Sequence, residues 1–129
     1  TYCLIAVPDT APLSKAIFMK IEEVKMGNIS LLLLEGRVDS NTSADAEAKI
    51  MSVIESGVHK LAVDFGQLDY ISSAGLRVFL LAAKQLKRVG GSIALSSMKP
   101  HIREVFDMSG FSALFSILPN KEEAVRSLQ

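Results

Sequence analysis

Residues 60–91 read KLAVDFGQLDYISSAGLRVFLLAAKQLKRVGG, and this stretch decides the predicted fold. Lys60–Phe65 is short and apolar, which suits an interior strand of a parallel sheet. We expect that strand to end near Phe65 and a loop to carry Asp69 and Tyr70. Ser73–Val89 then has apolar residues at helical spacing, and two glycines end it. A buried strand followed at once by an amphipathic helix indicates an α/β fold.

The flanking segments continue this alternation. Upstream, Phe18–Val24 and Ile29–Glu35 read as strands joined by a tight turn at Gly27-Asn28, and capping residues at 39–43 precede a helix that Gly57 ends. Downstream we expect a strand at SIALSS, a helix from Pro100 to Gly110, a strand at Leu114–Leu118 and a last helix after the capping-box pair Asn120 and Glu123. The predicted α/β domain is a single layer with a mostly parallel mixed sheet, opened by an N-terminal β-hairpin and packed with about four helices.

The first part of the chain lacks a structural period. Pro8 and Pro12 interrupt it, so we expect residues 1–17 to be an N-terminal arm, a cloning remnant or the tail of a preceding segment. Residues 18–129 are then the domain. A chain of 129 residues is long enough for one self-sufficient core.

Composition restricts the classes of function. Fourteen basic and fourteen acidic residues leave no net field to hold nucleic acid or an anionic membrane. The single Cys3 cannot form an internal disulfide, and no Cys/His cluster has ligand spacing, so no metal and no other cofactor is expected. The longest aliphatic run, Leu31–Leu34, is far too short to cross a bilayer. These features favour a cytoplasmic protein with a protein or small-molecule partner.

The junction between strand and helix is the main candidate site, because function in open α/β sheets collects beyond the carboxyl ends of the strands. In the simplest interpretation Ser72 caps the helix by accepting a hydrogen bond from a backbone N–H, which is worth about 1 kcal/mol. A second role is compatible with this one. The free N–H groups and the macrodipole of a helix N-terminus would stabilise a phosphate on Ser73, and Arg77 lies four residues on, where it could pair with that phosphate.

The same helix carries charged and apolar residues outside its main apolar stripe. Arg77, Lys84 and Arg88 form a basic row, and Ala74, Val78 and Leu81 form an apolar strip. A solvated face would explain the charges, and a broad core stripe would explain Val78 and Leu81. Together with Ser73, the two strips instead favour a surface that docks a protein partner.

An enzyme is the less favoured alternative. A serine nucleophile needs a base and an oxyanion site, but the histidines are only His59 and His101, and no G-x-S-x-G motif occurs. The chain also lacks a Walker-type phosphate loop and a dinucleotide-binding fingerprint. A serine hydrolase that uses Ser73 with His101 is the remaining enzymatic interpretation.

The text from residue 60 to residue 111 resembles the STAS domain, and specifically bacterial anti-sigma factor antagonists. The similarity runs from around Met19 to the end of the chain. It includes LEGRVDSNT, residues 34–42, and VFDMSGF, residues 105–111. Several linked motifs in the same register make the resemblance more specific than any one of them.

This resemblance implies a regulatory binding protein. In the family, the unmodified antagonist binds an anti-sigma factor that is itself a serine kinase, and this frees the sigma factor. Phosphorylation of one serine releases the complex, and a PP2C-type phosphatase resets it. The family acceptor lies two places before a glycine, which corresponds to Ser73 before Gly75.

Two positions depart from the family pattern. Ser72 replaces the aspartate that usually precedes the acceptor, which reduces the negative charge beside it unless Asp69 supplies that charge. Ala74 replaces a hydroxyl residue, which removes an alternative acceptor. Asp39 matches a family aspartate after the second strand, and with Gly36 and Thr42 it is expected near Ser73. The implied docking surface comprises Asp39, Thr42, Ser72, Ala74, Arg77, Val78 and Leu81.

The family also offers a different function. STAS modules occur in stressosome scaffolds, in lipid-trafficking complexes and as cytoplasmic appendages of anion transporters. A scaffold role in one of these systems is the alternative to an anti-sigma factor antagonist.

Overall fold

Six strands form one sheet in the computed structural model, which describes residues 2–5 and 19–129. In spatial order they are β1 (Tyr2–Ile5), β2 (Met19–Met26), β3 (Ile29–Val38), β4 (Lys60–Ile71), β5 (Ser92–Ser96) and β6 (Ser116–Leu118). The first two pairings, β1 with β2 and β2 with β3, are antiparallel, and the other three are parallel. The predicted mixed sheet opened by a hairpin is confirmed.

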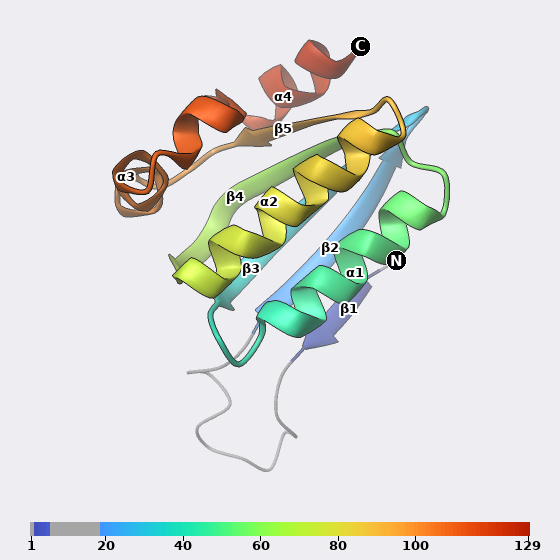
Figure 1. The fold of residues 1–129 in the computed structure, drawn as a ribbon. Helices are drawn as coiled ribbons and strands as arrows, with labels where there is room; N and C mark the ends of the chain where they lie inside the picture. The colour runs from blue at the N-terminus through green and yellow to red at the C-terminus, as the bar shows by residue number, and fades with distance from the viewer. Residues whose placement is uncertain (1, 6–18) are drawn as a thin grey trace.

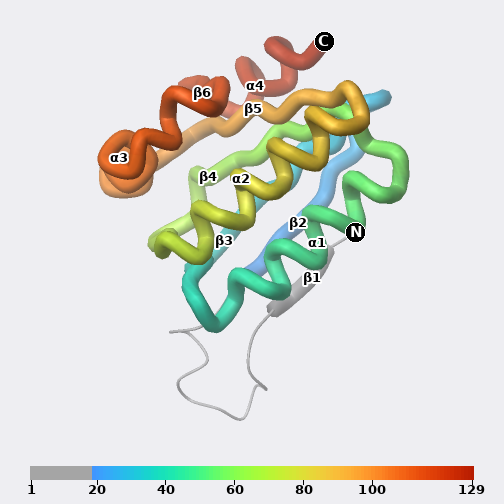
Figure 2. Tube along the Cα trace, in the orientation of Figure 1, coloured from blue at the N-terminus to red at the C-terminus, as the bar shows by residue number. Residues whose placement is uncertain are grey.

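Helices cover both faces of this sheet. The helices are α1 (Ser43–Glu55), α2 (Ser73–Arg88), α3 (Pro100–Met108) and α4 (Lys121–Leu128). Buried residues of α1, α2 and α3 belong to the larger apolar cluster, whereas α4 contributes to a separate cluster on the opposite face. Figures 1 and 2 show α1 and α2 side by side along one face, with α4 behind the sheet.

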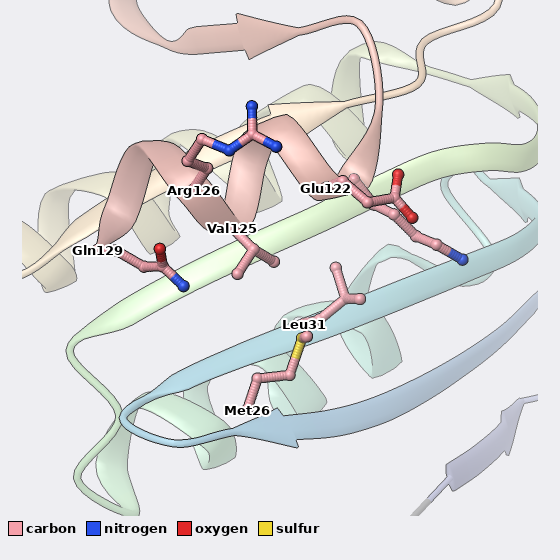
Figure 3. A pocket seen from close by; sticks show the side chains of 7 residues that line it. Met26, Leu31, Glu122, Val125, Arg126 and Gln129 are labelled. Atoms are coloured by element: carbon pink, nitrogen blue, oxygen red, sulfur yellow. The ribbon is translucent and has the colours of Figure 1, made fainter.

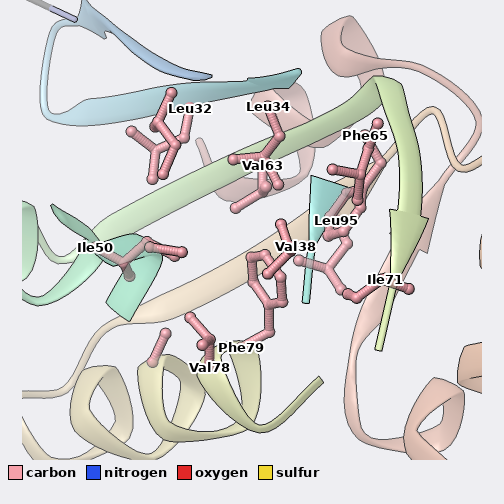
Figure 4. Close-up of a cluster of buried hydrophobic side chains, with 14 of the residues drawn as sticks. Leu32, Leu34, Val38, Ile50, Val63, Phe65, Ile71, Val78, Phe79 and Leu95 are labelled. Atoms are coloured by element: carbon pink, nitrogen blue, oxygen red, sulfur yellow. The ribbon is translucent and has the colours of Figure 1, made fainter. Parts of the chain in front are cut away.

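Strands β3 and β4 are rich in apolar residues in their first halves because both of their faces are largely buried there. On β3, Leu32 and Leu34 face the larger cluster, and Leu31 faces the α4 side. Figure 4 shows side chains from β3, β4 and α2 converging on one core. The rings of Phe65 and Phe79 meet there with centroids 5.1 Å apart. This contact fixes α2 against the sheet.

The end of β4 differs from the prediction. The strand continues to Ile71, so the expectation that it ends near Phe65 and that a loop carries Asp69 and Tyr70 is wrong. Its last residues pair with an equally extended β3, through register shifts on both sides of Gly36. Gly36 has a φ of 101°, which a residue with a side chain rarely adopts. The polar residues after Phe65 therefore belong to a strand, which is held in place by its pairing with β3.

Most of the remaining boundaries agree with the sequence. Gly27-Asn28 forms the hairpin turn, Pro100 begins α3, and Asn120 Oδ1 accepts a hydrogen bond of 2.8 Å from the Glu123 N–H at the start of α4. The last strand is shorter than predicted, because residues from Phe111 form the 3₁₀ turn η2 (Phe111–Leu114) before it.

The predicted arm contributes one edge strand. Residues 2–5 of the segment form β1, which pairs with Met19–Glu22 of β2. The rest of the expected arm, and the start of the predicted first strand at Phe18, lie outside the described residues. The domain boundary at residue 18 stays a prediction.

Replacement of Gly75 by alanine should destabilise the fold. A Cβ there would lie 2.7 Å from Ile71 Cγ1 and 2.8 Å from the Val38 carbonyl oxygen, and that backbone cannot easily move. We expect a loss of about 1–3 kcal/mol in the free energy of unfolding, measured by urea titration. Ala74→Gly in the same turn is the control, with a propensity cost of about 0.5–1 kcal/mol. A stabilised Gly75→Ala protein, as helix propensity alone predicts, would contradict the close packing.

Candidate docking site

The junction between β4 and α2 is organised by Ser72. Its N–H donates to the Val38 carbonyl at 2.9 Å, and its Oγ accepts from the Gly75 N–H at 3.3 Å. The predicted helix cap is therefore confirmed, and the Ser72 hydroxyl is engaged in it. Ser73 is the first residue of α2 and is exposed. Within the described part of the chain its hydroxyl has no hydrogen-bond partner.

The turn that leaves β3 lies next to this junction and is built around Thr42. Its Oγ1 accepts from the Asp39 N–H at 3.0 Å and donates to the Arg37 carbonyl at 2.9 Å. Thr42 is only 2% exposed. The expectation that its side chain lies on the docking surface is therefore wrong, because the side chain is buried and its hydroxyl holds the turn together.

Asp39 is held in the same turn. One carboxylate oxygen accepts from the Asn41 N–H at 2.9 Å, and the other lies 3.5 Å from Arg37 Nε. The side chain keeps 13% of its exposure, so it reaches the surface only at its edge. Asp39 is thus first a structural residue, with a small part available to a partner.

Arg37 and Tyr70 were missed by the sequence interpretation. The two residues are partners in the parallel register of β3 and β4, and the guanidinium carbon lies 4.4 Å from the ring centroid. A cation over an aromatic face is attractive, and this contact ties the end of β3 to the end of β4. Only the strand register places them together, so no local motif could have indicated the pair.

The start of α3 is fastened to the end of β4. Lys99 Nζ lies 2.8 Å from Asp69 Oδ1, and His101 Nε2 lies 2.7 Å from the Asp69 carbonyl oxygen. The hydrogen bond and the charge of Lys99 lower the pKa of Asp69. Because a carbonyl oxygen only accepts, Nε2 must carry the proton in this contact. That nitrogen therefore cannot serve as a base for Ser73.

The outer surface of α2 contains most of the predicted docking residues. Arg77, Lys84 and Arg88 are exposed, and Ala74 and Leu81 are partly buried. Val78 is only 2% exposed and belongs to the core, so its place on the docking surface is corrected. The reason is that α2 packs against both the sheet and α1, which buries a wider arc than one stripe.

One cavity lies on the opposite side of the molecule. It has a volume of about 260 Å³ and lies between the β2–β3 hairpin and α4, with Met26, Leu31 and Val125 among its lining (Figure 3). None of its lining residues belongs to the junction around Ser73. Among the described residues, no three potential metal ligands form a group, and no helix is long and apolar enough to cross a bilayer.

Comparison with known proteins shows what this chain is similar to. The family model of the STAS domain matches residues 20–124. BtrV of Bordetella bronchiseptica, named as a candidate anti-sigma factor antagonist, is 40% identical over 111 residues, which cover 86% of this chain and 96% of BtrV. The resemblance inferred from the sequence motifs is confirmed.

Solved structures share the fold. An anti-sigma factor antagonist from Mycobacterium paratuberculosis matches with a TM-score of 0.80 at 19% identity, over 92% of this chain and 97% of that one. The Bacillus antagonist SpoIIAA matches in its unphosphorylated form with a TM-score of 0.72 at 24% identity, over 81% of this chain and 92% of its own. Its phosphorylated form gives 0.67 at 23% identity, over 84% and 99%.

Thr42→Val should destabilise the protein without changing the shape of the side chain. The substitution leaves the Asp39 N–H and the Arg37 carbonyl without their partner, and we expect a loss of about 1–3 kcal/mol in the free energy of unfolding. Thr42→Ser keeps the hydroxyl and should lose less. Ser40→Ala, at an exposed neighbour, should change little. If valine is as stable as threonine in urea titrations, the hydrogen bonds do not hold the turn.

Lys99→Met should raise the pKa of Asp69 toward its ordinary value of 3.8, because it removes both the hydrogen bond and the nearby charge. The depressed pKa in the folded state means that the ion pair stabilises the fold above that ordinary value, and that this contribution disappears as the pH falls through the lowered pKa. Asp69 is exposed, so the effect on stability is small.

The measurement is an NMR pH titration of the Asp69 carboxyl carbon. Arg103→Met is the control, since Arg103 pairs with Asp107, at 3.1 Å, and not with Asp69. An unchanged Asp69 midpoint in Lys99→Met would show that the ion pair does not persist in solution.

Proposed function

The chain belongs to the STAS domain family, and we propose that it acts as an anti-sigma factor antagonist switched by phosphorylation of Ser73. The observation that carries the proposal is the division of roles between two adjacent serines. Ser72 is engaged in the helix cap, whereas the Ser73 hydroxyl is exposed and makes no hydrogen bond within the described residues. A kinase could therefore modify Ser73 without removing any contact of the fold.

The proposed docking surface is centred on Ser73. It comprises the exposed or partly exposed residues Asp39, Ser72, Ser73, Ala74, Arg77 and Leu81. They come from the end of β3, the junction and the first turns of α2, which the sheet brings to one edge. In its unmodified form this surface binds the anti-sigma factor, which is also the serine kinase, and a PP2C-type phosphatase restores it after phosphorylation. The proposed location is the cytoplasm, where these partners act.

Phosphorylation would switch the surface through charge. The phosphate adds close to −2 at the centre of the interface, and the amino end of α2 can accept it without refolding. Burying that charge without a partner costs several kcal/mol, which corresponds to a thousandfold or greater loss of affinity. SpoIIAA supports this view, since its phosphorylated and unphosphorylated forms both match the present fold.

The proposed activity is binding and not catalysis. His101, the base in the hydrolase interpretation, uses Nε2 to contact the Asp69 carbonyl oxygen at 2.7 Å. Among the described residues the Ser73 hydroxyl also makes no hydrogen bond to His101 or to another base, and a nucleophilic serine needs such a contact for its activation. The chain is the substrate of a kinase in this account, and an activity-based serine probe should leave it unlabelled.

Ser73→Asp should abolish binding of the anti-sigma factor, because it places a permanent charge at the docking surface. A pull-down from the native cell with wild-type and Ser73→Asp proteins in parallel should recover a kinase with the wild type only. Ser52→Asp is the matched control, since Ser52 is exposed on the neighbouring helix α1 and should retain the kinase.

The recovered kinase then supplies the second half of the test. Treatment of the wild-type protein with kinase and ATP should give one phosphate, located on Ser73 by mass spectrometry, and Ser73→Ala should stay unmodified. Equal binding of Ser73→Asp, or phosphate found on another residue, would overturn the assignment.

A further inference from the structure

Helix α2 differs from the other helices in the sign of its charges. It contains Arg77, Lys84, Lys87 and Arg88 and no acidic residue. Helices α1, α3 and α4 each mix basic and acidic residues, as in Lys121 and Glu122 of α4. The chain has equal numbers of acidic and basic residues, yet all the charged side chains of α2 are positive.

These cations are also unpaired. Six described cations outside α2 lie within 4.0 Å of a carboxylate. In the described part of the chain none of the four on α2 has an ion pair or a hydrogen bond, and all four are exposed. Lys84 and Arg88 lie four residues apart on one face of the helix, and the repulsion between their like charges destabilises it. Lys87 and Arg88 lie in the last turn, where the helix macrodipole favours cations, but nothing within the described fold accounts for Arg77 and Lys84.

The row is continuous with the proposed phosphoacceptor. At about 3.6 residues per turn, Ser73 and the cations other than Lys87 project within about 60° of one another around the helix axis. The row is about 22 Å long, which is several times the reach of one side chain. Leu80 and Leu81 lie beside it and are partly buried, so they add apolar contact along its length.

We propose that the whole outer face of α2, from Ser73 to Arg88, docks an acidic strip on the anti-sigma factor. This inference rests on the proposed function and specifies the chemistry of the partner. The charge complementarity steers the encounter and fixes the direction of the partner along the helix. Phosphate on Ser73 then acts in two ways, since it neutralises the Arg77 end of the row and repels the carboxylates that the row attracts.

A dodecaglutamate peptide provides a probe that does not depend on the kinase. In an NMR titration of labelled protein, the largest amide shifts should fall on residues 73–88, and they should disappear at high salt. Shifts spread equally over the exposed cations Lys25 and Lys121, or the absence of shifts, would overturn the proposal. So would binding of α2 to phosphatidylserine vesicles or duplex DNA when the peptide does not bind.

The second experiment uses the kinase recovered with the wild-type protein. Arg77→Glu/Lys84→Glu should lower its association rate by about tenfold or more at low ionic strength, and salt should reduce the difference. Lys25→Glu/Lys121→Glu carries the same change in net charge at two exposed cations without ion pairs and should stay within about twofold of wild type. Equal effects of the two variants, or a loss that salt does not reduce, would contradict the proposal.

The two proposals fail in different ways. If Ser73→Asp binds normally while Arg77→Glu/Lys84→Glu is slow, the phosphoswitch fails and the acidic partner stands. If Ser73→Asp loses binding while both charge variants behave alike, the switch stands and the basic row has no part in docking. Unfolding midpoints of both charge variants, measured in urea, show whether a slow rate reflects a damaged fold. If the midpoint of Arg77→Glu/Lys84→Glu falls, the peptide titration of the wild-type protein decides whether the basic row binds acidic partners.

Discussion

The structure depends on the way Ser72 joins β3, β4 and α2. Its N–H donates to the Val38 carbonyl on β3, and its Oγ accepts from the Gly75 N–H in the first turn of α2. Gly75 lets the helix approach β3 so closely that a methyl group would not fit. The position of Ser73 therefore follows from the backbone on either side of it and not from contacts of its own side chain. This is why its hydroxyl can change chemically while the scaffold stays in place.

Most residues around the junction hold the fold together, and a few others are exposed for binding a partner. Thr42 and most of Asp39 hold the turn after β3, the Arg37–Tyr70 contact ties the two strand ends, and Lys99 with His101 fastens α3 to Asp69. In the proposed mechanism Ser73, the outer face of α2 and the exposed edges of Asp39 and Ser72 meet the partner. A rigid edge of the sheet thus supports a small surface whose charge can be altered.

Much of this arrangement could be predicted because it is local. The apolar strand, the two serines and the helical spacing that follows lie within one short stretch, so the cap on Ser72 and the exposure of Ser73 were readable from it. The pairing of β3 with the last third of β4 could not be predicted, because the polar residues there are held by the register of the two strands and not by a hydrophobic pattern. Val78 and Thr42 were placed on the surface for a related reason. Packing of Val78 against its surroundings is a tertiary fact that a helical pattern does not contain. The hydrogen bond from Thr42 to the Arg37 carbonyl is local, but it depends on the shape of the turn, which the residue types alone do not give.

The central claim is that phosphate on Ser73 alters the docking surface without altering the fold. The most direct measurement is amide hydrogen exchange of the protein carrying phosphoserine at position 73, compared with the unmodified protein. The account predicts equal protection throughout β3, β4 and the buried face of α2, in a sample that no longer binds the anti-sigma factor. Loss of protection across α2 or the strand ends would show that the switch works by unfolding the junction, and would contradict the account.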